Sequence, residues 1–244
     1  MVGLDEGAMR MPNRVALAIF AKTPGRTPAK TRLAAGIGVE AAEAFYRASL
    51  DATAAIVDTA AARGPIDVIW ALAEPDAARD PLWTGRRTIG QGTGGLGERL
   101  HTVYSRLIAE RPAVLLIGCD SPHHSPAQFL APASALRNED EPADFRLGRC
   151  SDGGYWLLGG RRPIPRAAFL SVNYSAPTTA AETAAVLAPL GEIAEEPTSF
   201  DVDDAADLPR LRAALEALDK PLEAQRALLD RLSGNDSPCA VGPR

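Results

Sequence analysis

The sequence predicts an α/β fold, a single Rossmann-like domain with a mostly parallel β-sheet and helices on both faces. Short apolar runs at residues 15–20 and 113–117 are typical of strands buried on both faces. Between them, residues 39–62 carry apolar side chains at helical spacing, which predicts a long amphipathic helix. Strands that alternate with helices in this way favour a parallel sheet.

The other elements follow from local signals along the chain. Gly64 and Pro65 end the long helix. Ser125 as N-cap and Pro126 as first helical residue predict a helix to about 137, and a capping box of Thr179 and Glu182 predicts one to about 190. The remaining expected elements are strands at 66–72, 87–89, 144–148 and 154–158, and helices at 96–108, 205–218 and from about 221 to 232.

Composition limits the kind of protein. The chain has 244 residues, 46% of them apolar and 23% charged, as in an ordinary globular protein. The net charge of −5 argues against a general nucleic-acid-binding role. Its three cysteines lie far apart, which indicates neither a zinc site nor a disulfide framework.

The terminal segments differ from the rest of the chain. Residues 1–14 contain two acidic residues and no apolar core, so they do not resemble a signal peptide, and no run is long enough to span a membrane. A cytoplasmic location is therefore expected. We expect an N-terminal extension at 1–14, the folded domain at 15–232 and a disordered tail at 233–244, where Gly, Pro and Ser are frequent.

Asp120 follows the buried strand at 113–117. In open α/β sheets, ligands bind at the carboxyl ends of the strands. A carboxylate beside a sealed strand is costly unless it has a partner, and a divalent metal ion is a natural one. The alternative is an ordinary turn, because Asp, Ser and Pro are frequent in turns.

The loop after the first strand is basic. It contains Lys22, Arg26, Lys30 and Arg32 within eleven residues, which suits a diphosphate or triphosphate. The P-loop and Rossmann glycine patterns are absent. The alternative is a solvated basic loop.

The second candidate loop is glycine-rich and leads into the helix at 96–108. Gln91 and Gly92 begin it, and glycines let a backbone approach a ligand closely while a helix N-terminus favours an anion. A flexible loop without a ligand is equally compatible with this spacing.

Two acidic segments could complete a site. Asp152 lies in a predicted hairpin turn, where it could meet a substrate hydroxyl or cation, although Asp-Gly alone favours a turn. Asp204 and Asp207 suit a helix start, whereas Asp201 and Asp203 do not, and by alternation these two point the same way. Together with Asp120 they could hold one metal ion.

The histidines and Cys119 are weaker candidates. His101 lies between apolar helix positions, and His123 and His124 follow the turn at Asp120. No ordering of serine, histidine and aspartate predicts a hydrolase. Cys119 is interpreted as a small buried residue.

Taken together, five motifs resemble a bacterial family of GT-A-like proteins described as glycosyltransferases, often labelled radical-SAM/selenodomain-associated transferases. The motifs are Phe20-Ala-Lys-Thr-Pro-Gly with Lys30-Thr-Arg-Leu33, Gln91-Gly with Leu-Gly-Glu-Arg-Leu100, Leu116-Ile-Gly-Cys-Asp-Ser-Pro122, Leu147-Gly with Asp152-Gly-Gly-Tyr155, and Asp201-Val-Asp with Asp207-Leu208. The resemblance covers about 15–218. The chain departs from it at Gly95, usually acidic, and at Thr27, usually glycine.

The resemblance implies a GT-A fold similar to that of nucleotide-diphospho-sugar transferases, with a nucleotide-sugar or nucleoside-triphosphate site and Mg²⁺ or Mn²⁺. The residues expected to bind the donor are Lys22, Lys30, Arg32, Gln91 and Gly92. The expected metal ligands are Asp120, Asp201 and Asp203, and the expected catalytic residues are Asp120 and Asp152. The residues expected to contact the substrate are Gly153, Gly154 and Tyr155.

The expected reaction is glycosyl transfer from a nucleotide sugar to a small-molecule acceptor, with the metal and basic loop neutralising the diphosphate. One alternative is nucleotidyl transfer to a phosphorylated small molecule; the first loop has Lys-Thr-Pro-Gly rather than the Arg-Met-Gly-x-x-Lys of such enzymes. A second alternative is a non-catalytic nucleotide sensor.

Overall fold

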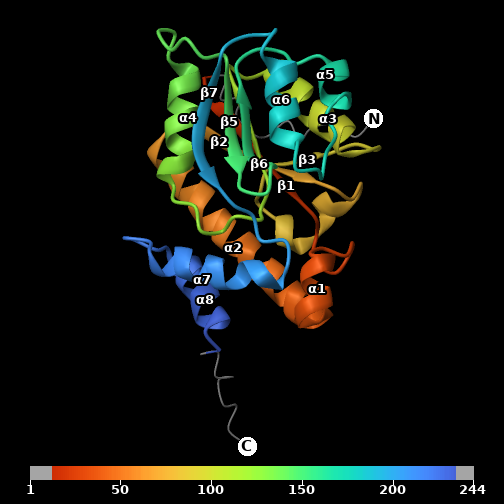
Figure 1. Ribbon diagram of the computed structural model, residues 1–244, viewed down its shortest axis with the longest axis vertical. Helices are drawn as coiled ribbons and strands as arrows, with labels where there is room; N and C mark the ends of the chain where they lie inside the picture. Colours follow the sequence, from red (N-terminus) through yellow and green to blue (C-terminus); the bar gives the residue numbers. More distant parts are fainter. Residues whose placement is uncertain (1–12, 235–244) are drawn as a thin grey trace, which may run out of the picture.

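A seven-stranded sheet in the order β3-β2-β1-β4-β6-β5-β7 is the centre of the computed structural model, which describes residues 13–234 (Figure 1). The strands are β1 (Val15–Ala21), β2 (Ile66–Leu72), β3 (Thr88–Gly90), β4 (Val114–Ile117), β5 (Phe145–Cys150), β6 (Tyr155–Gly160) and β7 (Ile193–Ser199). Only β6 runs antiparallel to its neighbours, β4 and β5. The predicted mostly parallel sheet is therefore confirmed.

Helices cover both faces of this sheet. Alternating side chains of β1 divide between the two layers, because successive residues of a strand point to opposite faces. Leu17 and Ile19 pack in the cluster under α2 (Val39–Arg63) and α4 (Ala127–Arg137). Ala16 and Ala18 pack in the cluster on the other face, with α3 (Leu96–Ile108), α5 (Arg166–Leu170) and α6 (Thr179–Leu187).

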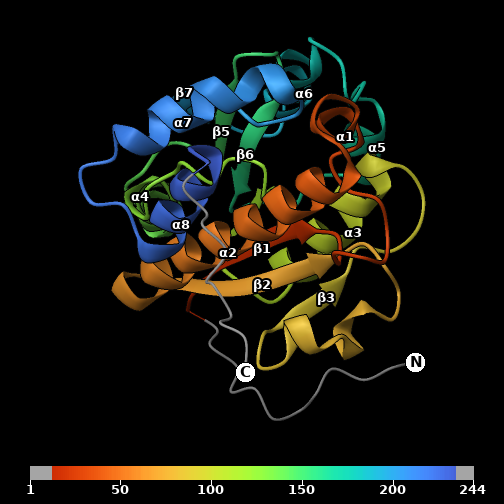
Figure 2. The ribbon, with the colours of Figure 1, turned by 90° about the horizontal axis from the view of Figure 1, so that it is seen from below.

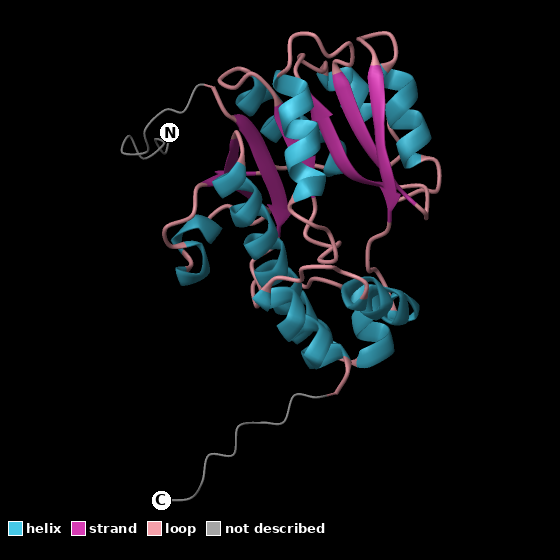
Figure 3. Ribbon diagram, turned by 90° about the vertical axis from the view of Figure 1, so that its left-hand side faces the viewer, coloured by secondary structure: helices cyan, strands magenta, loops and turns pink. Residues whose placement is uncertain are grey.

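A third apolar cluster lies beyond the sheet and builds a helical cap. It joins the first half of α2 to α1 (Thr31–Ile37), α7 (Leu208–Glu216) and α8 (Glu223–Leu232). Leu33, Phe45, Leu211 and Leu228 are buried there. The cap lies below the strands in Figures 1 and 3, and Figure 2 shows it along α2. It brings the segment after β7 next to the loop after β1.

Some elements were not predicted. β7 is an exposed edge strand with two glutamates and Pro197, so it lacks the apolar signal of a buried strand. α1 follows the basic loop and buries Leu33 alone. Two short 3₁₀ helices, Ala77–Arg79 and Pro81–Trp83, were also missed. The helix predicted at 205–218 begins as a 3₁₀ turn, Ala205–Asp207, and continues as α7.

Two predicted helix caps are wrong. α4 begins at Ala127, and the Ser125 amide donates to the Gln128 side chain (2.7 Å). α6 begins at Thr179 itself, whose hydroxyl donates to the carbonyl of Ala176 (2.8 Å). Glu182 instead accepts from the Thr178 hydroxyl (2.6 Å). At α4 the partner is a side chain of the helix itself, and at α6 the partners lie in the preceding turn.

Most of the predicted N-terminal extension and tail lies outside the described residues, and their boundaries stay a prediction. Between residues 13 and 234, none of the helices combines the length and the apolar character that a membrane crossing needs.

Candidate functional site

A cleft of about 530 Å³ opens at the carboxyl ends of β1, β2 and β4. Three segments predicted from the sequence meet in it: the basic loop, the glycine-rich loop and the turn after β4. Its lining includes Lys22, Lys30, Arg32, Gln91, Gly94, Arg99, Asp120 and Asp203. This is the position at which open α/β sheets bind ligands.

The backbone of the basic loop is fixed by side chains from other elements. The Tyr46 hydroxyl, on α2, accepts from the Lys22 amide (2.9 Å) and donates to the Lys22 carbonyl (3.0 Å). The Thr23 amide donates to the carboxylate of Glu74 (3.1 Å), and the Trp83 indole donates to the Thr23 hydroxyl (3.0 Å). The loop therefore presents a preformed surface to the cleft.

Lys30 makes the shortest ion pair among the residues that line the cleft. Its ammonium lies 2.6 Å from Asp120 and 3.7 Å from Asp203, and it donates to the Val202 carbonyl. Burial alone would lower the pKa of Lys30, but the charge and hydrogen bond of Asp120 outweigh it and raise the pKa. Asp120 thus has a partner from the protein itself.

The other cations of the loop divide into two groups. Arg32 lines the cleft and lies 3.2 Å from Asp203, with its side chain 69% exposed. Lys22 also lines the cleft, and its ammonium donates to the Pro28 carbonyl of the same loop (2.8 Å). Arg26 instead pairs with Asp80 at 3.1 Å and is absent from the lining.

Asp120 lies between two cavities. It lines the main cleft together with Asp203, and it also lines a smaller cavity of about 50 Å³ together with Asp201 and Tyr155. The Val202 amide donates to the Asp120 carbonyl (3.0 Å), which joins the turn after β4 to the segment after β7. Asp120 therefore shares the main cleft with Asp203 and the smaller cavity with Asp201, but among the described residues these three carboxylates do not form a group with ligand atoms within 4.8 Å of one another.

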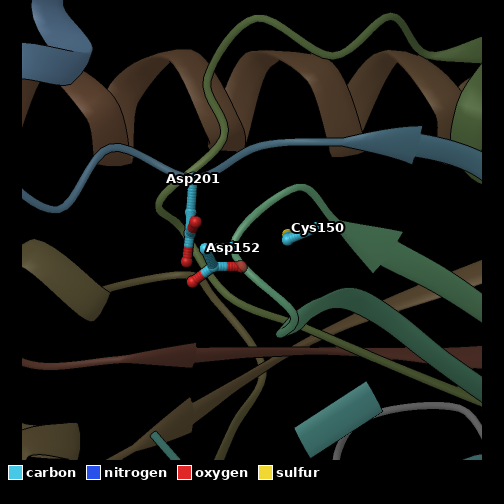
Figure 4. A group of neighbouring side chains, drawn as sticks. All are labelled: Cys150, Asp152 and Asp201. Atoms are coloured by element: carbon cyan, nitrogen blue, oxygen red, sulfur yellow. The ribbon is translucent and has the colours of Figure 1, made fainter. Parts of the chain in front are cut away.

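Asp152 and Asp201 face each other (Figure 4). Together with Cys150 they form a group that could hold a metal ion. The cysteine sulfur and one carboxylate oxygen of each aspartate lie within 4.8 Å of one another. Burial, followed by the charge of Asp152, raises the pKa of Asp201 to about 6. Burial also raises the pKa of the Cys150 thiol. Hard divalent cations prefer oxygen ligands, so the carboxylates of Asp152 and Asp201 are the better donors for such an ion.

The 3₁₀ turn Ala205–Asp207, with which the helix after β7 begins, is capped as predicted. Asp204 accepts from the Ala206 amide (2.8 Å), and Asp207 accepts from the amides of Asp203 (2.8 Å) and Asp204 (3.0 Å). These bonds fix the backbone on which Asp203 stands, and they leave the Asp203 carboxylate to the cleft.

The glycine-rich loop contributes Gln91 and Gly94 to the cleft lining, but not Gly92. Gln91 is buried, and its amide donates to the carbonyl of Ala71 (2.8 Å) near the end of β2. Gly92 has a φ of 81° and lies against Thr102. Arg99, which was not predicted, lines the cleft from the first turn of α3. Its position after a glycine-rich helix start was the available signal.

The turn between β5 and β6 is tightly built. Gly153 has a φ of 92°, and a side chain there would collide with the Pro177 carbonyl, 1.9 Å from the Cβ position. The Gly154 amide donates to Asp152 (2.9 Å). The two glycines and Tyr155 do not line the main cleft. In this structure the Gly154 amide orients Asp152 and Tyr155 lines the smaller cavity, and substrate contact remains a prediction.

His123 and His124 belong to the packing behind the site. Their Nε2 atoms lie 3.0 Å and 2.7 Å from the Ser199 hydroxyl, and the His123 ring stacks on Phe200. Burial, followed by the charge of Arg210, lowers the pKa of His123 to about 4. Cys119 is buried, as predicted, and burial raises its pKa to about 12.

The lowered pKa of His123 predicts acid sensitivity. Its folded pKa lies below the unfolded value, so its stabilising contribution is complete above about pH 6.5 and is lost as the pH falls toward 4. We expect the melting temperature to fall less between about pH 7.5 and pH 5 in His123→Gln than in the parent. His101→Gln, on α3, is the control. An equal fall in parent and variant would contradict this prediction.

Comparison with known proteins places the fold. Residues 56–176 match the family described as "Uncharacterized protein conserved in bacteria (DUF2064)". A protein from Desulfovibrio desulfuricans G20, provisionally described as a nucleotide-diphospho-sugar transferase, has a similar structure, with a TM-score of 0.77 and 21% identity over 91% of this chain and 96% of that one. The chain has a GT-A-like fold, and the DUF2064 match covers residues 56–176 of it. The resemblance inferred from the motifs is confirmed.

Nucleotidyltransferases share the same fold at lower similarity. A 4-diphosphocytidyl-2C-methyl-D-erythritol synthase from Anaerococcus prevotii DSM 20548 gives a TM-score of 0.52 at 14% identity, over 83% of this chain and 99% of that one. A nucleotidyl transferase from Methanothermobacter gives 0.53 at 14%, over 84% and 99%. No curated protein matches the sequence. At these identities the similarity establishes the fold.

Proposed function

We propose that this protein is a metal-dependent transferase that takes a nucleotide sugar as donor and a small molecule as acceptor. One observation carries the proposal: Lys30 and Arg32 meet Asp120 and Asp203 in one cleft of about 530 Å³ at the carboxyl ends of the strands. Phosphate needs the cations, and a metal ion that bridges protein and phosphate needs the carboxylates.

The side chains fit Mg²⁺ or Mn²⁺. Asp120 and Asp203 are 40% and 38% exposed, so their oxygen atoms are accessible from the cleft. Asp201 adds a third carboxylate from the adjacent cavity. Hard divalent cations prefer oxygen ligands and commonly use one or two protein carboxylates plus phosphates. Bound there, the metal would neutralise charge that develops on the leaving diphosphate.

The cations of the cleft would bind the donor's phosphates. Arg32 and Arg99 are suited to paired hydrogen bonds with phosphate oxygens, and Lys22 and Lys30 act as point charges. The fixed loop backbone at Lys22 and Thr23 means that little ordering is needed when the donor binds. Catalysis would then be mainly electrostatic and positional.

Asp152 is the proposed contact for the acceptor. It stands at the turn between β5 and β6, its orientation is fixed by the Gly154 amide, and it faces Asp201. A carboxylate in this place can accept a hydrogen bond from an acceptor hydroxyl and take its proton as the new bond forms.

Nucleotidyl transfer is the second candidate, because enzymes with that activity share the fold. Glycosyl transfer is preferred for two reasons. The first loop has Lys22-Thr-Pro-Gly25, and the structural similarity is greater to the protein described as a nucleotide-diphospho-sugar transferase.

The leaving group separates the candidates. Nucleotide sugars and nucleoside triphosphates are first screened by melting temperature with and without Mn²⁺, since a ligand at 100 times its Kd adds about 2.7 kcal/mol of stability. Stabilising nucleotides are then incubated with candidate acceptors. We expect release of a nucleoside diphosphate. Pyrophosphate release would instead establish nucleotidyl transfer, and tight binding without either product would indicate a sensor.

A further inference from the structure

Lys30 occupies the space between two of the proposed metal ligands. Its ammonium is 2.6 Å from an oxygen of Asp120 and 3.7 Å from an oxygen of Asp203, and it also donates to the Val202 carbonyl. An ammonium has three donors and no acceptor. All three of its recorded partners are oxygens of the turn after β4 or of the segment after β7, so a cation already bridges these two segments.

The fold builds this contact at a conformational cost. Lys30 has φ 54° and ψ 43°, the left-handed region that residues with a Cβ atom rarely adopt. Its side chain is only 6% exposed, although both carboxylates that it contacts are more than a third exposed. The Ala34 amide donates to the Lys30 carbonyl (2.8 Å) and fixes the residue at the start of α1. A merely solvated lysine needs none of these features.

A divalent ion on the same two carboxylates would be close to the ammonium. Like charges repel strongly in a partly buried site, where screening by water is weak. The donor's diphosphate offers Lys30 another anionic partner in the same cleft. Metal and donor would therefore assist each other's binding, and this coupling is reciprocal by thermodynamic necessity.

We propose that Lys30 is a resident counter-cation that competes with the divalent metal for Asp120 and Asp203, so that the metal binds tightly only with the donor. This inference rests on the metal-dependent function proposed above. It adds a binding order to that function. Without a donor, the Lys30 ammonium pairs with Asp120 and Asp203. When the donor's diphosphate binds Lys30, the two carboxylates become free to bind the metal.

Titration of Mn²⁺ alone into the full chain tests the competition, with free Mn²⁺ followed by electron paramagnetic resonance. We expect Lys30→Met to bind Mn²⁺ at least about tenfold more tightly than the parent, or about 1.4 kcal/mol. Mn²⁺ should also raise its melting temperature more than that of the parent. Lys30→Arg keeps the charge and should stay near the parent.

Two further variants locate the effect. Adding Asp120→Asn to Lys30→Met should abolish the gain in Mn²⁺ affinity, because the gain requires that carboxylate. Arg212→Met is the matched control, since it removes an exposed cation that pairs with Glu216 on α7. It should leave Mn²⁺ affinity unchanged. If Lys30→Met does not fold, Lys30→Gln removes the same charge and is judged by the same tenfold criterion.

The outcomes separate this inference from the proposed function. If Lys30→Met binds Mn²⁺ no more tightly than the parent, while the parent binds Mn²⁺ together with a donor nucleotide, the competition is refuted and the metal-dependent function stands. If neither protein binds Mn²⁺ even with a donor, metal dependence and competition are both refuted.

Discussion

Asp120→Asn is expected to lower Mn²⁺-dependent donor binding by at least about 100-fold, more than is typical when a residue that only supports a metal ligand is lost. Asp120 is the carboxylate common to both cavities, and its side-chain oxygen is the one that Lys30 contacts at 2.6 Å. Asparagine keeps the shape and removes the charge. Isothermal titration with the stabilising nucleotide, with and without Mn²⁺, measures the loss.

The same variant should melt at a lower temperature than the parent. If the Asp120 carboxylate had no partner beside the buried strand, asparagine would leave stability unchanged or improve it. In the structure the carboxylate has a partner, and its loss leaves the buried ammonium of Lys30 with Asp203 at 3.7 Å. We expect a cost of about 1–3 kcal/mol, less than for a fully buried pair because Asp120 is 40% exposed.

Asp58→Asn is the control for both effects, since it removes an exposed carboxylate that lies 3.8 Å from Arg86, outside the cleft. Metal-dependent binding that is equal in Asp120→Asn and in the parent would remove Asp120 from the metal site.

Lys30→Met and Arg32→Met are expected to slow transfer by roughly 10²–10³-fold, the effect of losing a preorganised group that stabilises developing charge. Both should bind the nucleoside of the donor almost normally. For the parent, a nucleoside diphosphate should bind more tightly than the nucleoside alone. For each variant this difference in affinity should be small, because one of the cations that contact the diphosphate is missing. Comparing the Kd of nucleoside and nucleoside diphosphate for each variant gives the measurement.

Arg26→Met is a matched control from the same loop. Arg26 pairs with Asp80 at 3.1 Å and does not line the cleft. Its loss should therefore leave the difference in affinity between nucleoside and nucleoside diphosphate unchanged. If the diphosphate increased the affinity of Lys30→Met and Arg32→Met as much as that of the parent, the basic loop would be a solvated surface feature.

The amino-acid sequence by itself determined the layered fold and the edge of the sheet at which the candidate site lies. The apolar runs of β1 and β4 can only be buried on both faces, and the helix periodicities around them require a covered sheet. Asp120 follows β4 after Gly118 and Cys119, so its position at the carboxyl edge depends on local chain order alone. The caps at Asp204 and Asp207 were predictable for the same reason, because their partners lie within four residues.

The tertiary structure alone decided which charges meet. β7 has no apolar signal, and only its pairing with β5 sets the direction of the segment that carries Asp201 and Asp203. Lys30 reaches Val202 across 172 residues of sequence. No local pattern encodes such a contact, since it depends on the packing of α1 and α7 into one helical cap. A charged group on a surface loop forms such an ion pair only when the packing of apolar side chains elsewhere brings the opposite charge close.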